Sequence, residues 1–273
     1  MKSTSVFGFL LGIFTLVSCE KETTLQVENE GIPLLAREIY TDDLYWEYTY
    51  TNANLLHEIK TKFCYTVYSY NDINLLTGYD IYEDTRIYSS DWATAESAMH
   101  RQEWVNPHNT PKSGQGIYFY NHGRLNKIVV TRPISSYESV STFEYDTLGR
   151  IRKESFQDGF IEYLYSDHGN LIRQKQYFLV DGEFKLITMK EYEYDEQQNP
   201  FKAFNKLLRP GKYMNENNIV RETVTLFSGN ADEVQVTEST YEYNEEGYPV
   251  KKDNMITYEY KWFFISFDIV FEY

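Results

Sequence analysis

The sequence has few of the residues that supply disulfides, metal ligands and basic surfaces. Its 273 residues include two cysteines, five histidines and seven prolines. The 26 Lys and Arg side chains are outnumbered by 41 Asp and Glu, which gives a formal net charge of −15. An acidic chain of this kind is a poor partner for nucleic acid or for anionic lipid headgroups. We therefore expect no nucleic-acid partner.

Residues with a recognisable pattern for chemistry are also scarce. No two histidines are spaced four apart and no HExxH occurs, so we expect no metal site and no cofactor; the histidines are His57, His100, His108, His122 and His168. Cys64 lies in a strand-like run and is expected to pack rather than to react. Paired carboxylates for glycan hydrolysis stay possible with so many acidic residues, yet no pair stands out. No catalytic residue is therefore assigned.

The longest apolar run, residues 6–17, is shorter than the roughly 20 residues that a membrane-spanning helix needs. It follows Lys2 and ends in Leu16-Val17-Ser18-Cys19, which resembles the bacterial lipobox. We predict a lipoprotein signal peptide over 1–18, a lipid-bearing Cys19 and a tether over 19–35. An uncleaved membrane anchor is the alternative.

Aromatic residues are abundant, with 26 tyrosines and 17 phenylalanines. Many of them fall in a repeated unit, aromatic-x-Tyr, a polar turn ending in Gly or Asn, and then apolar residues. Copies of the unit occupy 48–56, 68–76, 118–125, 143–151, 163–171, 192–201 and 241–250, and an incomplete copy begins at Tyr258. Such internal repetition defines the architecture before any single motif does.

One unit predicts one β-hairpin. The two aromatic rings lie on one face of a strand because side chains alternate with period two. Asp146 or its equivalent after the second tyrosine is expected to cap a turn, and Gly149, Gly169 or Gly247 to adopt positive φ there. We expect the hairpins to be stabilised by cross-strand aromatic pairs, each about 0.2–1 kcal/mol, rather than by a compact central core.

The pattern Tyr145-Asp146-x-x-Gly149-x-Ile151 is similar to the YD repeat of Rhs-type and teneurin-type proteins. With the lipobox, the chain resembles uncharacterised bacterial lipoprotein families built from such repeats, one of which has a porin-like β fold. The resemblance covers about residues 40–260 and implies an antiparallel sheet that curls or closes. It implies no established activity. Asn replaces the turn glycine at Asn54, Asn74 and Asn199, and Gly123 comes one residue early.

Two long gaps separate the repeats. In the first, an insertion at about 89–116, Asp91 is expected to cap a helix over 92–104, and 106–116 is expected to be a loop. Trp92 and Trp104 in this insertion are the candidate ligand-contacting aromatics. In the second, 208–218 is expected to be a loop, and 219–227 with 232–243 another hairpin.

We predict an all-β protein: one domain over 36–273 that forms a large antiparallel meander, curled or closed into a barrel. The expected function is a non-enzymatic lipoprotein, anchored in the outer membrane through Cys19 on its periplasmic or cell-surface side. It would bind or scaffold a glycan or an envelope protein. A glycan hydrolase and a membrane-embedded barrel are the alternatives; the latter is raised by the alternating apolar C-terminus, 265–273.

Overall fold

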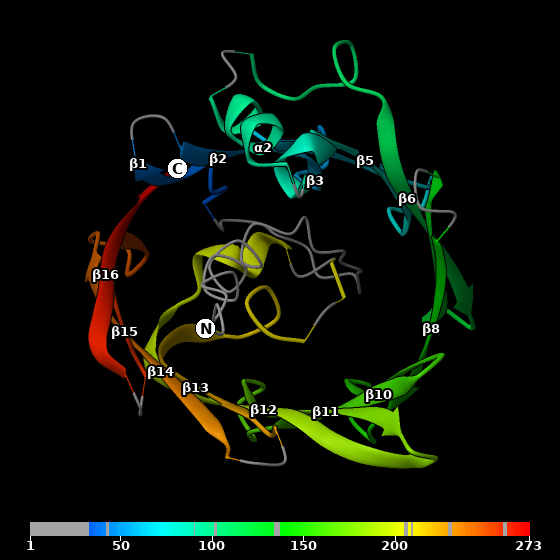
Figure 1. Ribbon diagram of the computed structural model, residues 1–273, viewed down its shortest axis with the longest axis vertical. Helices are drawn as coiled ribbons and strands as arrows, with labels where there is room; N and C mark the ends of the chain where they lie inside the picture. The colour runs from blue at the N-terminus through cyan, green and yellow to red at the C-terminus, as the bar shows by residue number, and fades with distance from the viewer. Residues whose placement is uncertain are drawn as a thin grey trace, which may run out of the picture.

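The structure is a computed structural model that describes residues 33–41, 44–89, 91–100, 103–133, 137–204, 207–208, 210–228, 231–258 and 261–273. Within these residues the chain forms sixteen antiparallel strands, paired in sequence order in one sheet. The last strand pairs with the first, so the sheet closes into a barrel (Figure 1). The predicted all-β meander is confirmed, and its closed form is the one adopted.

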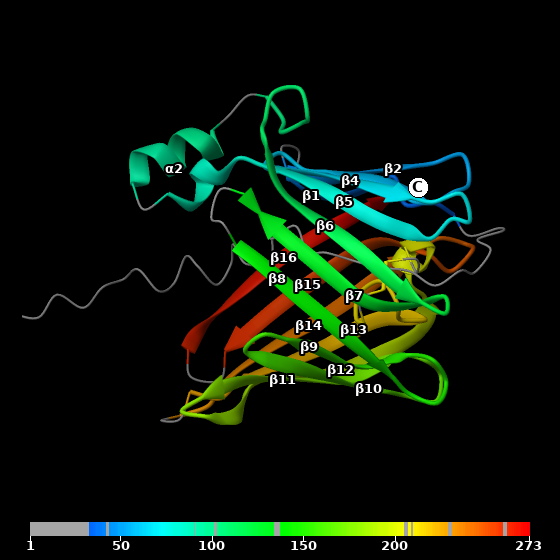
Figure 2. The same ribbon diagram turned by 90° about the vertical axis from the view of Figure 1, so that its right-hand side faces the viewer.

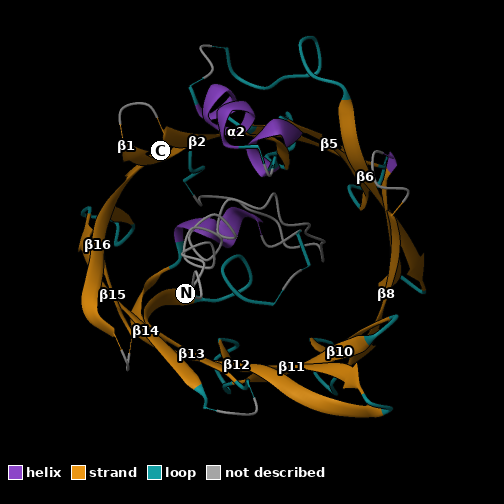
Figure 3. Cartoon of the chain, in the orientation of Figure 1, coloured by secondary structure: helices purple, strands orange, loops and turns teal. Residues whose placement is uncertain are grey.

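The first eight strands are β1 (Arg37–Thr41), β2 (Leu44–Tyr50), β3 (Leu56–Lys60), β4 (Cys64–Tyr70), β5 (Leu76–Glu83), β6 (Lys112–Asn121), β7 (Arg124–Arg132) and β8 (Tyr137–Tyr145). The others are β9 (Ile151–Phe156), β10 (Gly159–Tyr165), β11 (Leu171–Val180), β12 (Glu183–Gln198), β13 (Asn217–Leu226), β14 (Glu233–Tyr243), β15 (Pro249–Tyr258) and β16 (Lys261–Glu272). Figure 3 shows that the barrel wall is strand throughout. The hairpin expected after residue 218 is thus present as β13 and β14.

Alternation along each strand divides the side chains between the inside and the outside of the barrel. On β2, Tyr48 is buried in the hydrophobic core, whereas its neighbours Glu47 and Thr49 lie on the outer face. On the C-terminal strand β16, Phe267, Ile269 and Phe271 belong to or pack against the same core. The apolar face of the last strand therefore points into the barrel.

The turns have the geometry that the repeat predicts. In five repeats the residue after the second tyrosine accepts a side-chain hydrogen bond from the backbone N–H four residues later, as Asp146 does from Arg150 at 2.8 Å. The fourth turn residue has positive φ in each, including Asn54 and Asn74. Asparagine tolerates this region better than most residues, so both departures from glycine keep the turn. The early Gly123 belongs to a two-residue turn.

A β-bulge recurs in all seven full repeats, and a hydrogen bond from the second tyrosine to a backbone carbonyl recurs in the first six; in the seventh, Tyr243 donates to the Asp195 carboxylate. The bulge lies just before the second tyrosine, where two residues of the following strand oppose one: Glu144 pairs with Lys153 and Tyr145 with Ile151, which leaves Arg152 as the extra residue. The hydroxyl of the second tyrosine then donates to a backbone carbonyl of the preceding hairpin, as Tyr165 does to Ile151 at 2.8 Å. Equivalent bonds join Tyr50 to Leu35, Tyr70 to Leu56, Tyr120 to Leu76, Tyr145 to Leu125 and Tyr194 to Leu171.

The segment between β12 and β13, residues 199–216, folds inside the ring of strands (Figure 1) and is called the inner segment below. It contains the 3-10 helix η5 (Pro200–Phe204), and its Phe204 is fully buried against Tyr48 with ring centroids 4.9 Å apart. The ammonium of Lys212 lies 3.0 Å from both carboxylate oxygens of buried Glu38 on β1. The expectation that the barrel lacks a compact core is therefore wrong, because the inner segment packs against the wall and fills one end of the barrel (Figure 2).

The insertion between β5 and β6 projects at the opposite end of the barrel (Figure 2). It contains the 3-10 helix η3 (Thr85–Tyr88) and the helix α2 (Trp92–Met99), and Asp91 caps α2 by accepting from the Thr94 N–H at 3.1 Å. The helix is shorter than predicted and ends at Met99. The Trp104 carbonyl accepts from Asn106 and Asn109, and the Val105 N–H donates to the Lys62 carbonyl, so these groups form no helical hydrogen bonds. The expected loop also ends early, since 112–116 pair with β5.

Candidate functional site

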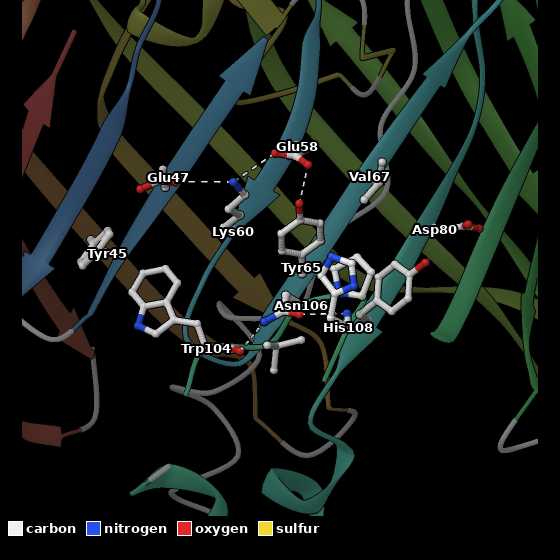
Figure 4. A pocket seen from close by; sticks show the side chains of 13 residues that line it. Tyr45, Glu47, Glu58, Lys60, Tyr65, Val67, Asp80, Trp104, Asn106 and His108 are labelled. Carbon is white, nitrogen blue, oxygen red and sulfur yellow. Dashed lines mark hydrogen bonds and ion pairs between the residues drawn. The ribbon is translucent and has the colours of Figure 1, made fainter. Parts of the chain in front are cut away.

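A groove of about 730 Å³ lies on the outer wall of the barrel, over β2 to β5, and is called the outer groove below. The insertion covers one side of it with the loop 104–108 (Figure 4). Its lining is mainly aromatic and charged: Tyr45, Glu47, Glu58, Lys60, Tyr65, Val67, Asp80, Tyr82, Trp104, Val105, Asn106, Pro107 and His108. It is the larger of the two hollows described on the molecule.

Strand register gathers these side chains. Glu47 pairs with Lys60, Lys60 with Tyr65, and Tyr65 with Tyr82, so residues from four successive strands share one row on the outer face. Tyr65 and Tyr82 meet edge to face, with centroids 6.3 Å apart. Adjacent strands thus present one continuous surface to the solvent.

Trp104 contributes an aromatic ring from the insertion. Its ring lies 4.4 Å from that of Tyr45, centroid to centroid, tilted by 45°. The Trp104 carbonyl accepts hydrogen bonds from the side-chain amides of Asn109, at 2.7 Å, and Asn106, at 3.3 Å. The next residue, Val105, is buried and donates its N–H to the Lys62 carbonyl at 3.3 Å. The indole is therefore held at the groove by a hydrogen-bonded loop.

A charged network crosses the middle of the groove. The Lys60 ammonium lies 3.1 Å from the Glu58 carboxylate and 3.6 Å from that of Glu47. Glu58 also accepts from the Tyr65 hydroxyl and, at 2.7 Å, from the hydroxyl of Thr49. Burial by itself raises the pKa of Glu58, but the hydrogen bonds from Tyr65, Thr49 and Lys60 outweigh it, and the pKa is lowered. Glu58 is therefore a fixed, ionised acceptor.

This arrangement suits binding better than acid catalysis. A glycosidase general acid needs a raised pKa so that it is protonated near neutral pH. The pKa of Glu58 has the opposite shift, and Lys60 forms ion pairs with both Glu58 and Glu47. At the far edge of the groove, Asp80 is paired with Lys112 at 3.1 Å. The groove thus offers aromatic faces beside polar groups that already hold one another in place.

The predicted site residues have different outcomes. Trp104 lies in the outer groove, whereas Trp92 begins α2 and its side chain is not among those described. Cys19 and the proposed signal peptide lie outside the described residues. His108 lines the groove, and His122 has positive φ in a turn. No group of three metal-binding side chains and no helix long and apolar enough to cross a bilayer occurs in the described ranges.

The four groove residues Tyr45, Glu58, Lys60 and Asp80 are not recognisable as neighbours from the sequence. The only signal for them was the alternation of polar and aromatic residues on consecutive hairpins. That signal recurs all around the barrel, so it does not single out these four strands. The insertion, whose residues 104–108 line the groove, marks the site.

No protein-family model and no curated protein sequence matches the chain. The structure is similar to the crystal structure of a porin-like protein from Bacteroides uniformis, with a TM-score of 0.51 and 12% identity, covering 87% of this chain and 94% of that one. A porin-like protein from Bacteroides vulgatus matches with a TM-score of 0.41 and 12% identity, covering 88% and 99%. The first likeness shows a porin-like β-barrel fold, while membership of a YD-repeat family stays a prediction.

Proposed function

We propose that this protein is a lipid-anchored β-barrel of the cell envelope that binds a glycan in the outer groove. The observation that carries the proposal is the Trp104–Tyr45 aromatic pair beside the Glu47–Lys60–Glu58 network. Ligand sites typically combine aromatic surface with a few fixed polar groups. Sugar rings present both an apolar face and hydroxyl groups, so they match such a surface.

The location of the ring also favours binding. Trp104 is half-buried, so part of the indole stays open to the groove. The loop that holds it is fixed by the side-chain amides of Asn106 and Asn109, which both donate to the Trp104 carbonyl. A rigid aromatic surface loses little conformational entropy when a ligand covers it.

The outer wall supports a barrel that stands in water and is tethered to the membrane. A barrel embedded in lipid carries an outward apolar band. Here ion pairs occupy the outer face around most of the circumference, among them Arg37–Glu47, Lys112–Asp80, Arg173–Glu191, Arg221–Glu238 and Lys251–Asp253. A lipid anchor at Cys19 then supplies the attachment to the membrane that the wall does not.

The proposal is tested by binding the full-length chain, in a non-ionic detergent, to an array of envelope and dietary glycans, and measuring Kd for the best ligand. We expect Trp104→Ala and Tyr45→Ala each to raise Kd about tenfold, equivalent to about 1.4 kcal/mol. Phe119→Ala is the matched control, because Phe119 is an exposed aromatic on the outer face of β6, outside the groove.

Two results would contradict the proposal. One is an array without any ligand. The other is a ligand whose Kd is the same for the wild type and Trp104→Ala, because that ligand binds elsewhere. If an envelope protein binds in place of a glycan, and Trp104→Ala weakens that binding, the groove binds a protein. An envelope protein is the other class of partner expected from the sequence.

A further inference from the structure

The wall opposite the outer groove carries a second hollow, of about 320 Å³, over β9, β10 and β11. Four cationic side chains line it, two from β9 and two from β11: Arg152, Lys153, Arg173 and Lys175. We call this the basic hollow. It stands out because the whole chain has a net charge of −15.

The recurring bulge creates half of the basic hollow. Strict alternation would place the consecutive residues Arg152 and Lys153 on opposite faces of the wall. The bulge on β9 sets both of them opposite Glu144, and both lie outside. Arg152 forms an ion pair with Glu144, and Lys153 lies 4.1 Å from the centroid of the Phe160 ring.

The charges of the basic hollow are not fully compensated. Arg152 and Arg173 each have a carboxylate partner, Glu144 and Glu191 respectively. Lys153 and Lys175 are the two cross-strand neighbours of Glu162. Among the described residues, neither lysine has a carboxylate oxygen within 4.0 Å.

Burial and the neighbouring Glu162 carboxylate raise the pKa of the Tyr177 hydroxyl, so Tyr177 adds no charge beside the single carboxylate between the two lysines. The four cations therefore face three carboxylates, with the excess positive charge on the lysines.

We propose that the basic hollow is a second binding site, which takes a phosphate group. Two guanidinium groups held in place by Glu144 and Glu191 keep N–H donors in excess of those that the ion pairs use, since arginine has five. Arginine forks and lysine point charges are the groups that bind phosphate oxygens. Exposed Leu164 lies in the same hollow and offers apolar surface beside the charges.

The site differs from the outer groove in both charge and position. In the groove the lining lysine, Lys60, is paired with two carboxylates, those of Glu47 and Glu58. The basic hollow lies on other strands and shares no residue with the groove. The phosphate can belong to a membrane-lipid headgroup or to a soluble or polymeric compound, and the protein chemistry is the same for both.

The test uses the full-length chain in a non-ionic detergent, titrated calorimetrically with inorganic pyrophosphate at two salt concentrations. The same preparation is examined by native mass spectrometry with phosphatidylglycerol and with zwitterionic phosphatidylcholine. We expect saturable binding that weakens with salt. The double variant Lys153→Gln/Lys175→Gln should weaken it about tenfold.

Lys127→Gln is the matched control. Lys127 is an outer-face lysine on β7 that lies outside the hollow. Its ammonium lies 4.4 Å from the centroid of the Phe119 ring, much as that of Lys153 lies 4.1 Å from the centroid of the Phe160 ring. Its substitution should leave Kd unchanged. Lys175→Glu is a second variant, at a half-buried position of the outer face, and should weaken binding as well; thermal melting confirms folding of each protein.

Pyrophosphate binding without phosphatidylglycerol adducts supports a soluble or polymeric phosphate. Adducts of phosphatidylglycerol in excess of phosphatidylcholine support a lipid headgroup. The proposal is overturned if neither probe binds, or if Lys127→Gln weakens binding as much as the double variant, which would show a general charge effect. Glycan binding at the outer groove is unaffected by either result.

Discussion

The inner and outer faces of the barrel wall differ in chemistry although the same strands supply both. Inside, tyrosines, leucines and phenylalanines pack around the inner segment, and charged groups lie among them, such as the Glu38–Lys212 pair and buried Lys252 beside the Tyr241 ring. Outside, ion pairs run from strand to strand, and both described hollows are there. This arrangement is the reverse of a barrel in lipid, which is apolar outside and polar within. The strands therefore build a core inside the barrel, and both sites that we propose for binding lie on the outer wall.

The strongest test of this contrast is attachment to the membrane. If the outer wall faces water, the anchor depends on Cys19 alone, so Cys19→Ala should abolish both lipid labelling and membrane association. Metabolic labelling with a clickable fatty acid, followed by fractionation, measures both. Ser18→Ala is the control and should be labelled normally, because it keeps a small residue at the predicted cleavage position. A Cys19→Ala protein that stays in the membrane fraction would show an embedded barrel.

The next largest effect contrasts two phenylalanines. Phe204 of the inner segment is fully buried against Tyr48, Phe201 and Tyr213, whereas Phe184 is 56% exposed. Phe204→Ala should lower the free energy of unfolding by about 3–5 kcal/mol, since it leaves a cavity. Phe184→Ala should lower it by less than about 0.5 kcal/mol. Urea denaturation measures both, and equal losses would mean that the inner segment does not form the core.

The buried ion pair gives a smaller effect and a pH signature. Lys212→Met should cost about 3 kcal/mol because Glu38 then stays buried without its cation. Burial alone raises the pKa of Glu38, but Lys212 and the hydroxyls of Tyr48 and Tyr40 outweigh it and lower the pKa below 4.5.

Since the folded pKa is the lower one, the wild-type pair stabilises the protein above about pH 4.5, and this contribution is lost as the pH falls through the folded pKa. Unfolding titrations between pH 3 and 7 should show this loss for the wild type and not for Lys212→Met. Arg221→Met, which breaks an exposed pair with Glu238, should cost less than about 1 kcal/mol. An identical pH profile for the wild type and Lys212→Met would exclude the ion pair as its source.

The smallest effect concerns one of the recurring hydrogen bonds from the second tyrosine of a repeat to a backbone carbonyl, which we call the tyrosine series. Tyr165→Phe removes only the hydroxyl that donates to the Ile151 carbonyl, so we expect a loss of about 1 kcal/mol. Thermal unfolding of this variant should show a modest decrease in Tm without a change in the circular dichroism spectrum. A loss as large as that of Phe204→Ala would mean that the series sets the register of the barrel in addition to adding stability.

The repeats made much of the fold predictable. The alternation of aromatic-x-Tyr predicts hairpins, and the turn residues at Asp146 and Gly149 predict their reversals, because both depend only on neighbours along the chain. Asp91 likewise predicts the start of α2. The end of that helix was not predictable, since Asn109 and Lys62 take up the backbone groups of Trp104 and Val105. Trp104 was found as a candidate from its place in the insertion, but its partner Tyr45 lies 59 positions away in the sequence.

The sequence by itself determined the strands, the turns and the composition of each strand face, because short-range alternation and φ preferences do not depend on the rest of the fold. Only the tertiary structure decided which face lies inside. Closure of β1 on β16 and entry of the inner segment bury the tyrosine face and leave the face with the ion pairs on the outside. The bulge that places Arg152 beside Lys153, and the loop that sets Trp104 on Tyr45, likewise depend on register between strands. Register is a relation between distant segments, and no single stretch of sequence contains it.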